Sequence, residues 1–506
     1  METSKRVLFN SVVLYIKIII NMLISLVSVP LILHALGESD YGLYNLVAGL
    51  ISMLAFLNSS MAITTQRYLS IAIGEGNRSR LNNIYNVALI LHLLIGLVVV
   101  ALFEICYLFL FDSFLNIEPD RVQAAKIVYQ FIVLSTLFTI LSVPFCAVLN
   151  AKENMLSFSV IAIVESLLKL VLAFSLGRCV FDRLIVYGGG MAIISLLSMA
   201  LYGTCVKVKY KELEVSFKKH FSNYTLLQML SFTGWSTFGA VSMIGRNQGT
   251  AVLFNLFCGT VANAAYGIAN QINGVLGYFS ATFQKALNPQ LMQSEGMNNR
   301  PRLIRLSMIS SKYSVWVIAL FAIPLIMEMP YVLRIWLNDI PDNTLQLSRL
   351  VLVLSIVYQF SVGLMSSIQA VGKIKDYFIV MSLLILLNLP ICYLVLRVGM
   401  PMYYCIVVFI IIEFISLIVR LFMAHNIVGI DIFAFVKQVL VPDSLCIVAG
   451  TILSFPMHCL MRESFLRLVV VSALYLAGYL MIAWFFVFDD EVKKTAKLGL
   501  LKVKTR

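Results

Sequence analysis

The sequence predicts an all-α polytopic membrane protein of about fourteen transmembrane helices, with two parallel-repeat six-helix lobes around a central cavity and two extra C-terminal helices. Three observations support this fold class. The 506-residue chain is 60% hydrophobic and only 12% charged, whereas ordinary globular proteins carry about 25% charged residues. Apolar runs long enough to cross a membrane recur along the whole sequence. A polar segment near residue 70 also recurs close to residue 290.

The apolar runs follow one another with short polar connections. A helix needs about 20 predominantly apolar residues to cross a membrane. By this measure we expect helices at roughly residues 8–36, 43–73, 84–111, 123–150, 156–177, 184–206, 225–258, 260–293, 304–336, 344–371, 376–397, 401–424, 439–460 and 465–488.

The N-terminus and the cysteines exclude several other classes. The opening METSKRVLFN lacks a small-residue cleavage site, so the first predicted helix is an uncleaved anchor. The nine cysteines are scattered singly without CxxC spacing. They predict neither a disulfide framework nor a metal site, and we expect no cofactor.

The positive charge follows the topology. The net charge is +13, but the basic residues lie in short segments between apolar runs, which the positive-inside rule explains better than a nucleic-acid partner does. We therefore expect both termini of this multi-pass protein to be cytoplasmic. The predicted cytoplasmic residues are Lys5, Arg6, Arg78, Arg80, Lys152, the Lys207–Lys219 loop, Arg300, Arg302, Arg305, Lys373, Lys375, Arg420, Lys437 and the tail; the outer ones are Arg121, Arg178, Arg183, Arg397, Arg462 and Arg467.

An internal repeat organises the chain. The segment TQRYLSIAIGEGNRSRL resembles FQKALNPQLMQSEGMNNRPRL, and the match pairs Arg67 with Lys285. It also pairs Glu75-Gly76 with Glu295-Gly296, and Arg80-Leu81 with Arg302-Leu303. The copies lie an even number of helices apart, which indicates parallel repeats. We therefore expect an N-lobe over residues 1–206, a basic cytoplasmic linker over 207–224, a C-lobe over 225–424, and two further helices with a basic cytoplasmic tail over 425–506.

Buried cations and polar stripes mark the candidate binding site. An arginine near the centre of a spanning helix costs about 2.5–3.5 kcal/mol, so Arg67 needs a water-filled cavity, a partner or a ligand. Polar residues at helical spacing accompany this and other cations. We expect the cavity cations Arg67, Lys285, Lys17 and Arg246, together with the polar residues Asn21, Gln66, Asn247, Gln248, Asn270 and Gln284, to bind substrate.

Two other interpretations of these residues stay open. Small and polar residues at helical spacing also form packing seams between membrane helices. Lys17 and Lys285 lie toward the predicted cytoplasmic ends of their helices, where long side chains can extend to lipid phosphates.

Acidic residues inside the predicted helices are few: Glu104, Glu165, Glu328 and Glu413. Glu165 and Lys169 are four residues apart, which predicts a local ion pair. Glu104 is the candidate for proton or cation coupling. The helices that carry the repeat and the stripes contain no embedded acid, so the predicted cavity is cationic. Arginine and lysine bind phosphate, and the amides suit sugar hydroxyls, which together favour a phosphate-linked glycan on a lipid tail.

The segment LILHALGESDYGLYNLVAGL (Leu31 to Leu50) resembles the opening of bacterial polysaccharide biosynthesis membrane proteins, the Wzx-type O-antigen flippases of the multidrug/oligosaccharidyl-lipid/polysaccharide exporter superfamily. This resemblance implies alternating access that moves an undecaprenyl-diphosphate-linked oligosaccharide, the repeat unit of O-antigen, lipopolysaccharide, capsule or exopolysaccharide, across the inner membrane. It also implies contact with membrane lipids and with glycan polymerase machinery. In the related lipid II flippases the cations of corresponding helices hold the diphosphate, and here Lys17, Arg67 and Lys285 occupy those helices.

Two alternatives belong to different functional classes. A cation-coupled multidrug exporter of the same fold commonly needs acidic residues in its cavities, whereas the repeat helices here offer cations. A membrane polysaccharide polymerase is an enzyme and would show a sizeable external loop or acidic residues near the membrane surface, whereas the outer loops here are short. We therefore expect a transporter and not an enzyme.

Overall fold

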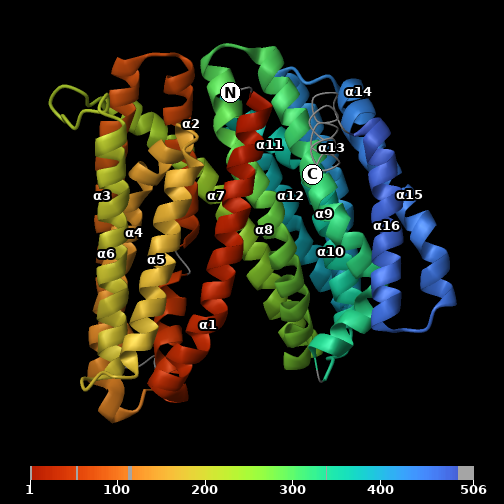
Figure 1. The fold of residues 1–506 in the computed structure, drawn as a ribbon, viewed down its shortest axis with the longest axis horizontal. Helices are drawn as coiled ribbons and strands as arrows, with labels where there is room; N and C mark the ends of the chain where they lie inside the picture. The colour runs from red at the N-terminus through yellow and green to blue at the C-terminus, as the bar shows by residue number, and fades with distance from the viewer. Residues whose placement is uncertain (1–2, 53–54, 112–116, 338, 488–506) are drawn as a thin grey trace, which may run out of the picture. The chain divides into compact units, whose positions relative to one another are not determined.

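The computed structural model describes residues 3–52, 55–111, 117–337 and 339–487, and these residues form helices and connections with no β-strand (Figure 1). The all-α class is confirmed. The elements are α1 (Thr3–Ser52), α2 (Ala55–Gly74), α3 (Arg78–Phe109), η2 (Pro119–Arg121), α4 (Val122–Ala151), α5 (Met155–Leu176), α6 (Arg183–Lys209), α7 (Asn223–Cys258), α8 (Thr260–Gly296), α9 (Arg300–Trp336), α10 (Thr344–Phe360), α11 (Val362–Val371), α12 (Lys375–Arg397), α13 (Tyr403–Val428), α14 (Ile432–Phe435), η3 (Val436–Leu440), α15 (Val441–Leu460) and α16 (Phe465–Phe486).

Ten helices among the described residues are long and apolar enough to cross a membrane. The pair α10 and α11, bent by 41°, makes an eleventh if it is one span. Three more of the predicted helices, α2, α7 and α8, are 20, 36 and 37 residues long but more polar. These three carry most of the polar stripes, which lower their hydropathy.

The first two predicted helices have different boundaries in the structure. A break between residues 36 and 43 is expected, but α1 continues to Ser52 across a kink at Gly37, whose φ of 81° is left-handed. Helical geometry resumes directly after this residue, so the interruption is a single position. The next helix starts at Ala55 instead of residue 43.

The helices form two compact units. Unit 1 contains Met1–Ala240 together with Asn288–Asn299, and unit 2 contains Val241–Leu287 together with Arg300–Arg506. Both α7 and α8 pass from one unit to the other, so the last turns of α8 pack in unit 1. The predicted basic tail after residue 488 lies outside the described residues.

Unit 1 is built around α4. This helix packs against α2, α3 and α6, and α5 packs between α1 and α6 (Figure 1). Its buried side chains include Val128, Tyr129 and Ile132, and the Tyr129 hydroxyl donates to the carbonyl of Phe103 at 2.6 Å. Because lipid tails are as apolar as these side chains, close packing and such interhelical hydrogen bonds hold the helices together.

The repeat ends meet at two glycines in unit 1. A Cβ on Gly74 would lie 2.2 Å from the carbonyl oxygen of Gln293, and one on Gly296 would lie 2.1 Å from that of Ile71. The contact is reciprocal, because each glycine faces the residue three positions before the other. The backbones of α2 and α8 therefore cross at a distance that only glycine permits.

This crossing corrects the register of the repeat. The structure pairs Gly74 with Gly296 as helix ends, and the following helices begin at Arg78 and Arg300. The left-handed residues of the two turns, Gly76 and Asn298, then also correspond. The predicted match of Glu75-Gly76 with Glu295-Gly296 is wrong by two residues, whereas that of Arg80-Leu81 with Arg302-Leu303 keeps this register. In it Arg67 corresponds to Pro289, and Lys285 to Ile63, so the predicted match of Arg67 with Lys285 is also wrong.

The segment after α6 is held in an extended form by two asparagines of α3. Asn82 donates to the carbonyl of Glu212 at 3.0 Å and accepts from the amide of Glu214 at 2.8 Å. Asn86 repeats the pattern one turn later, with the carbonyl of Glu214 at 2.7 Å and the amide of Ser216 at 2.8 Å. Lys152 adds an ion pair with Glu212 at 3.0 Å. Much of the predicted linker is thus fixed to unit 1.

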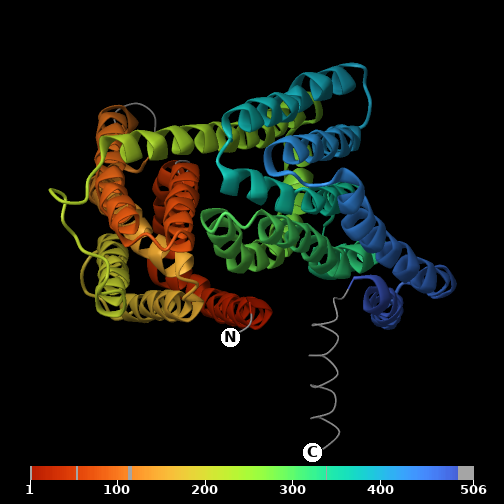
Figure 2. The ribbon, with the colours of Figure 1, turned by 90° about the horizontal axis from the view of Figure 1, so that it is seen from above.

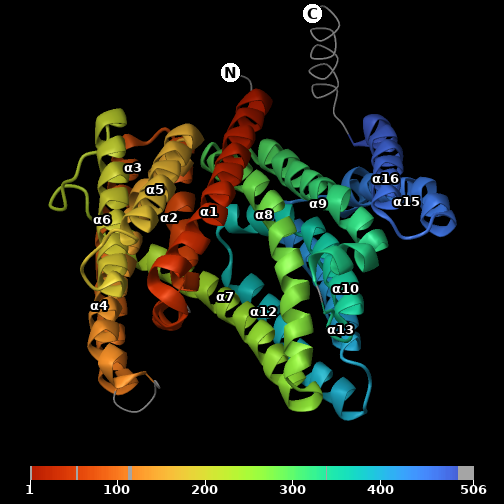
Figure 3. The same ribbon diagram turned by 60° about the horizontal axis from the view of Figure 1, so that its bottom comes forward.

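Unit 2 has its core between α7, α8, α10, α12 and α13. Figure 3 shows α10 beside α9 and α13, and these pairs are in contact. Phe254 stacks edge-on against Tyr266 with ring centres 5.2 Å apart. Cys392 and Cys405 lie fully buried in the same core. The two helices of the extra C-terminal pair, α15 and α16, lie at the edge of unit 2 against α9 (Figure 2).

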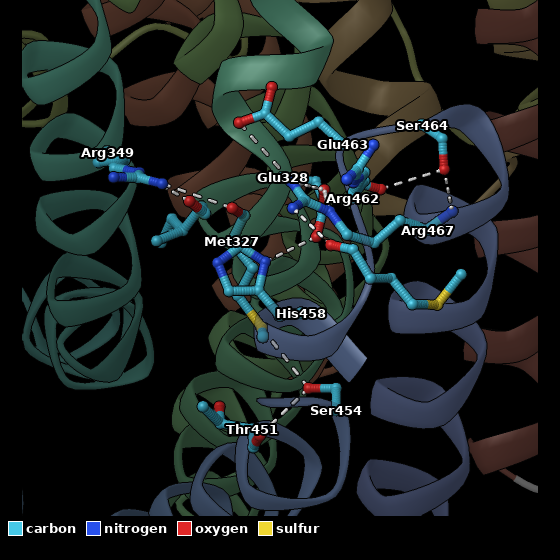
Figure 4. A network of polar contacts seen from close by, with 12 residues as sticks. Met327, Glu328, Arg349, Thr451, Ser454, His458, Arg462, Glu463, Ser464 and Arg467 are labelled. Carbon is cyan, nitrogen blue, oxygen red and sulfur yellow. Dashed lines mark hydrogen bonds and ion pairs between the residues drawn. The ribbon is translucent and has the colours of Figure 1, made fainter. Parts of the chain in front are cut away.

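A buried polar network fixes this C-terminal pair to α9 (Figure 4). Glu328 is fully buried where α9 loses helical geometry, and it accepts hydrogen bonds from His458 at 2.8 Å and Arg467 at 2.9 Å. Pro330 has no N–H to offer the carbonyl of Ile326 four residues earlier. Arg349 donates to that carbonyl instead, at 2.9 Å. Arg467, which is expected on the outer side at the start of its helix, is therefore a buried partner of Glu328.

Candidate functional site

A polar cavity of about 330 Å³ lies inside unit 2, with Arg246 of α7 in its wall. The remaining walls come from α8, α10 and α13. Its volume is within the range of about 300–1,000 Å³ typical of small-molecule sites. The polar lining residues are Arg246, Asn273, Ser280, Gln284, Ser355, Tyr358, Gln359 and Glu413.

The stripe of α8 forms one wall of this cavity. Asn273, Gly277, Ser280 and Gln284 are three or four residues apart and share a helix face. Ser280 donates to Gln359 of α10 at 2.6 Å, and Gln284 donates to Ser280 at 3.1 Å. This hydrogen-bonded row gives the wall a fixed orientation.

Arg246 is 9% exposed. Its guanidinium lies over the ring of Phe409, with the central carbon 4.9 Å from the ring centre. Its Nε and Nη2 donate to Oδ1 of Asn247 at 3.2 and 3.1 Å. Asn247, which the sequence predicts to bind substrate, thus orients the guanidinium. Arginine has five N–H donors, so Arg246 retains donors that a ligand can accept.

The cavity also contains an acid that the sequence analysis did not place there. Glu413 of α13 lines it and is paired with Arg420, and both side chains are buried. Arg420, which is expected near the cytoplasmic end of its helix, lies two turns from Glu413 on the same face of α13. This acid comes from α13 and not from the stripe-bearing helices α7 and α8, which contribute no acid to the described lining. Because Arg420 pairs with Glu413, Arg246 gives the cavity one surplus positive charge.

The other predicted ligands of unit 2 lie away from this cavity wall. Lys285 is half-buried and is not among the lining residues, because its neighbour Gln284 faces the cavity. Gln248 and Asn270 are exposed. Of the predicted residues, this cavity therefore brings together Arg246 and Gln284, with Asn247 behind Arg246.

Arg67 of α2 lies in unit 1 and is 7% exposed. Its guanidinium carbon is 4.9 Å from the ring centre of Tyr68 and 4.8 Å from that of Phe232 in α7. Cation–π contacts of this kind contribute about 0.5–2 kcal/mol each, more where water is excluded. The ring faces thus offset part of the cost of burying the charge.

The other predicted ligands of unit 1 are less enclosed. Lys17 is half-buried, and its Nζ lies 4.9 Å over the ring of Phe158 in α5. Gln66 and Asn21 are also half-buried, and Oδ1 of Asn21 has no hydrogen-bond partner among the described residues. A ligand donor can satisfy that atom.

The acids of unit 1 have partners. Glu165 accepts from Lys169 at 2.7 Å, which confirms the predicted ion pair, and from Ser198 at 2.7 Å. Glu104, the candidate for coupling, accepts a long hydrogen bond of 3.3 Å from Gln130 of α4. No cluster of His, Cys, Asp and Glu within the described ranges is arranged to hold a metal ion.

A protein-family model and several solved structures resemble this chain. A family model described as MatE matches residues 14–175, less than half of the chain. The chain is also similar to a crystal structure of MATE in the straight conformation, with 15% sequence identity, a TM-score of 0.72, and coverage of 85% of this chain and 97% of that one. The chain has the MATE fold. Proteins of the MATE family are transporters, not enzymes.

Two further MATE-fold structures resemble the chain. One is an outward-facing multidrug resistance MATE family transporter of the MOP superfamily, with 15% identity, a TM-score of 0.71, and coverage of 85% and 96%. The other is a MOP superfamily transporter from Pyrococcus furiosus, described as having a binding pocket of reverse polarity that suggests a different function, with 15% identity, a TM-score of 0.70, and coverage of 86% and 97%. No curated protein sequence matches the chain.

The residues that α10 and α13 contribute to the Arg246 cavity were not predicted from the sequence. Tyr358, Gln359 and Glu413 lie on helices outside the repeat, and nothing local distinguishes them from packing residues. One signal was present. Glu413 and Arg420 are opposite charges two turns apart in an apolar helix, and such a pair is rarely exposed to lipid.

Proposed function

We propose that this chain is a membrane transporter whose substrate is an anionic amphiphile, and specifically a polyprenyl-diphosphate-linked oligosaccharide of the O-antigen, capsule or exopolysaccharide type. The observation that carries the proposal is the surplus positive charge of the Arg246 cavity. Glu413 is already neutralised by Arg420. Arg246 therefore attracts a negative group.

The chemistry of the cavity suits a phosphate. Arginine N–H groups form charge-assisted hydrogen bonds with phosphate oxygens, about twice as strong as neutral ones. Asn247 and Phe409 hold the Arg246 guanidinium in place, which lowers the entropy lost on binding. Asn273 and Gln284 in the wall offer amides that suit sugar hydroxyls.

Arg67 gives unit 1 a second buried cation. The rings of Tyr68 and Phe232 lie against its guanidinium, and such rings attract a cation. A diphosphate carries more charge than Arg246 alone balances. We propose that the two units contribute at different stages of transport, and that the lipid tail stays in the bilayer.

Binding of a small prenyl diphosphate tests the proposal. Purified protein in detergent is titrated with farnesyl diphosphate and, separately, with tetraphenylphosphonium. We expect farnesyl diphosphate to bind the wild type. Arg246→Gln should weaken its affinity at least tenfold, which is about 1.4 kcal/mol of binding free energy. The matched control is Arg397→Gln, since Arg397 is exposed at the end of α12. Equal binding by wild type and Arg246→Gln would sink the proposal.

The glycan itself is tested in cells that depend on this transporter. Arg246→Gln should reduce surface glycan and cause lipid-linked intermediate to accumulate, while Arg397→Gln should do neither. Normal glycan export by a properly inserted Arg246→Gln variant would remove the glycan from the proposal.

A cation-coupled multidrug exporter is the second candidate, and the comparisons favour it over the glycan flippase. The MatE match and the multidrug transporter among the similar structures both point that way. In addition, Glu413 supplies the cavity acid that such an exporter needs. Tighter binding of tetraphenylphosphonium than of farnesyl diphosphate by the wild type would favour this candidate.

A further inference from the structure

We propose that unit 2 carries a second ligand site, a pocket for the headgroup of an anionic phospholipid at the start of α9. A cavity of about 510 Å³ lies there, and its lining residues are Pro301, Ile304, Arg305, Met308, Ile309 and Lys312 of α9, with Gln438 of η3. It is larger than the Arg246 cavity and shares no lining residue with it. The site therefore goes beyond the proposed transport function.

The lining of the pocket is one continuous face of α9. Its α9 residues lie at intervals of three or four positions from Pro301 to Lys312, which places them in a row along the helix. The opposite wall is η3, a single π-helical turn between α14 and α15. π-Helical turns are rare and occur frequently at functional sites. Here the turn presents the exposed amide of Gln438 to the pocket.

The charges of the pocket suit a phosphodiester. Arg305 is exposed and Lys312 half-buried, and the two cations lie about two turns apart on the same wall. No acidic side chain is among the described lining residues. Both cations therefore attract an anionic phosphodiester, and the planar fork of Arg305 fits two of its phosphate oxygens.

The pocket lies where headgroups are. α9 has 37 residues and is roughly 55 Å long at 1.5 Å per residue, whereas the hydrocarbon core is about 30 Å thick. The helix carries Arg300, Arg302, Arg305 and Lys312 within its first thirteen residues. This end therefore extends beyond the hydrocarbon, and basic pockets between helices at that level bind anionic lipid headgroups.

The apolar part of the lining favours a lipid over free phosphate. Met308 and Ile309 lie between the two cations on the same face, and Ile304 directly precedes Arg305. Inorganic phosphate would leave these side chains in contact with water. A phospholipid covers them with its glycerol and the first methylenes of its acyl chains while the phosphate contacts Arg305.

Lipid titration tests the site. Full-length protein in detergent is titrated with short-chain phosphatidylglycerol, short-chain phosphatidylcholine and inorganic phosphate, and binding is followed by native mass spectrometry and thermal stabilisation. We expect phosphatidylglycerol to bind and Arg305→Gln to weaken this binding about tenfold. Lys312→Gln should weaken it less, because an ammonium contacts phosphate as a single point charge without the two-pronged geometry of arginine. Arg397→Gln is the matched control and should bind as the wild type does.

The outcomes separate this site from the transport site. Arg246→Gln should leave phosphatidylglycerol binding unchanged, and Arg305→Gln should leave farnesyl diphosphate binding unchanged. Equal binding of phosphatidylglycerol and phosphatidylcholine would overturn the proposal, because the charge would then have no role. Competition by inorganic phosphate at the same concentration as phosphatidylglycerol would also overturn it, since the ligand would then be a free anion. An Arg305→Gln variant that binds phosphatidylglycerol as tightly as the wild type contradicts it directly.

Discussion

The two units accommodate buried charge in different ways. In unit 1, Arg67 lies against the aromatic rings of Tyr68 and Phe232. In unit 2, Arg420 is paired with Glu413, and Arg467 is paired with Glu328. Rings attract a cation without neutralising it, whereas a carboxylate cancels its charge. In unit 2 the surplus charge belongs to Arg246, which lies beside an ion pair that is already balanced.

This difference predicts how each unit responds to substitution. Removing one partner of a buried ion pair leaves an uncompensated charge, which costs several kcal/mol. Removing a ring costs less, because the cation loses only one of its contacts. Substitutions of the ion pairs should therefore affect folding most strongly, and those of the rings should have a modest effect.

The largest effect is expected from Arg420→Gln. It leaves the carboxylate of Glu413 buried without its cation, and we expect the free energy of unfolding in detergent to fall by about 3–5 kcal/mol. The double variant Glu413→Gln/Arg420→Gln should recover much of this loss, because neither charge remains. Denaturant titration measures both. A double variant as unstable as Arg420→Gln would mean that packing, not charge, is responsible.

A smaller effect is expected from Glu328→Gln. Glutamine keeps one acceptor oxygen for His458 or Arg467 but loses the charge-assisted bonds, and we expect a loss of about 1.5–3 kcal/mol. The control is Glu75→Gln, since Glu75 is an exposed residue that pairs with the exposed Arg80 outside this network, and this pair should contribute less than about 1 kcal/mol. Equal losses in the two variants would show that burial of Glu328 is not what makes its network stabilising.

In unit 1, Phe232→Leu sharpens the comparison. It removes the ring from the Arg67 guanidinium and keeps an apolar side chain, so we expect a coupling energy of about 0.5–2 kcal/mol between the two residues. A double-mutant cycle with Arg67→Met measures it through unfolding in detergent. Strict additivity of the two single substitutions would show that the ring does not stabilise the cation.

The smallest effect concerns the segment after α6. Burial raises the pKa of Glu212, but its own backbone amide and Lys152 outweigh this and lower that pKa below its ordinary value of 4.5. A carboxyl whose pKa is lowered on folding stabilises the fold above its unfolded pKa, and this contribution is lost as pH falls through the folded pKa. We expect amide exchange at Glu214 and Ser216 to increase relative to α3 below about pH 4.5.

The matched control for this experiment is Glu212→Gln. It lacks the titrating carboxyl, so exchange at Glu214 and Ser216 should show no such step with pH. An identical step in the wild type and in this variant would assign the change to another group.

Much of the fold follows from local sequence. The length of the apolar runs predicts most helix boundaries within a few residues. This works because the backbone N–H and C=O groups of each spanning helix must form hydrogen bonds within that helix. The sequence places a break after residue 36, where the structure has the kink at Gly37, but it does not predict that helical geometry resumes directly after this residue. The register of the repeat was also missed, because Gly74 and Gly296 become recognisable only where the two backbones cross.

The site was predicted in part. Arg246 and Gln284 follow from helical spacing, because both lie on the faces of polar helices. Glu413 and Arg420 become part of the site only through the packing of α13 against α10, which no local pattern specifies. The partners of Arg420 and Arg467 were not predicted, because Glu328 reaches Arg467 only through the packing of α9 against α16 and the two-turn spacing alone does not establish that Arg420 pairs with Glu413.

The most direct test is the relative affinity for farnesyl diphosphate and tetraphenylphosphonium, measured by calorimetry before and after Glu413→Gln. This substitution removes the acid of the Arg246 cavity and leaves both of its arginines. The account predicts that the wild type prefers farnesyl diphosphate and that Glu413→Gln maintains or increases this preference, because the positive charge of the cavity rises. The account would be contradicted if the wild type bound tetraphenylphosphonium more tightly than farnesyl diphosphate and the Glu413→Gln variant lost this preference.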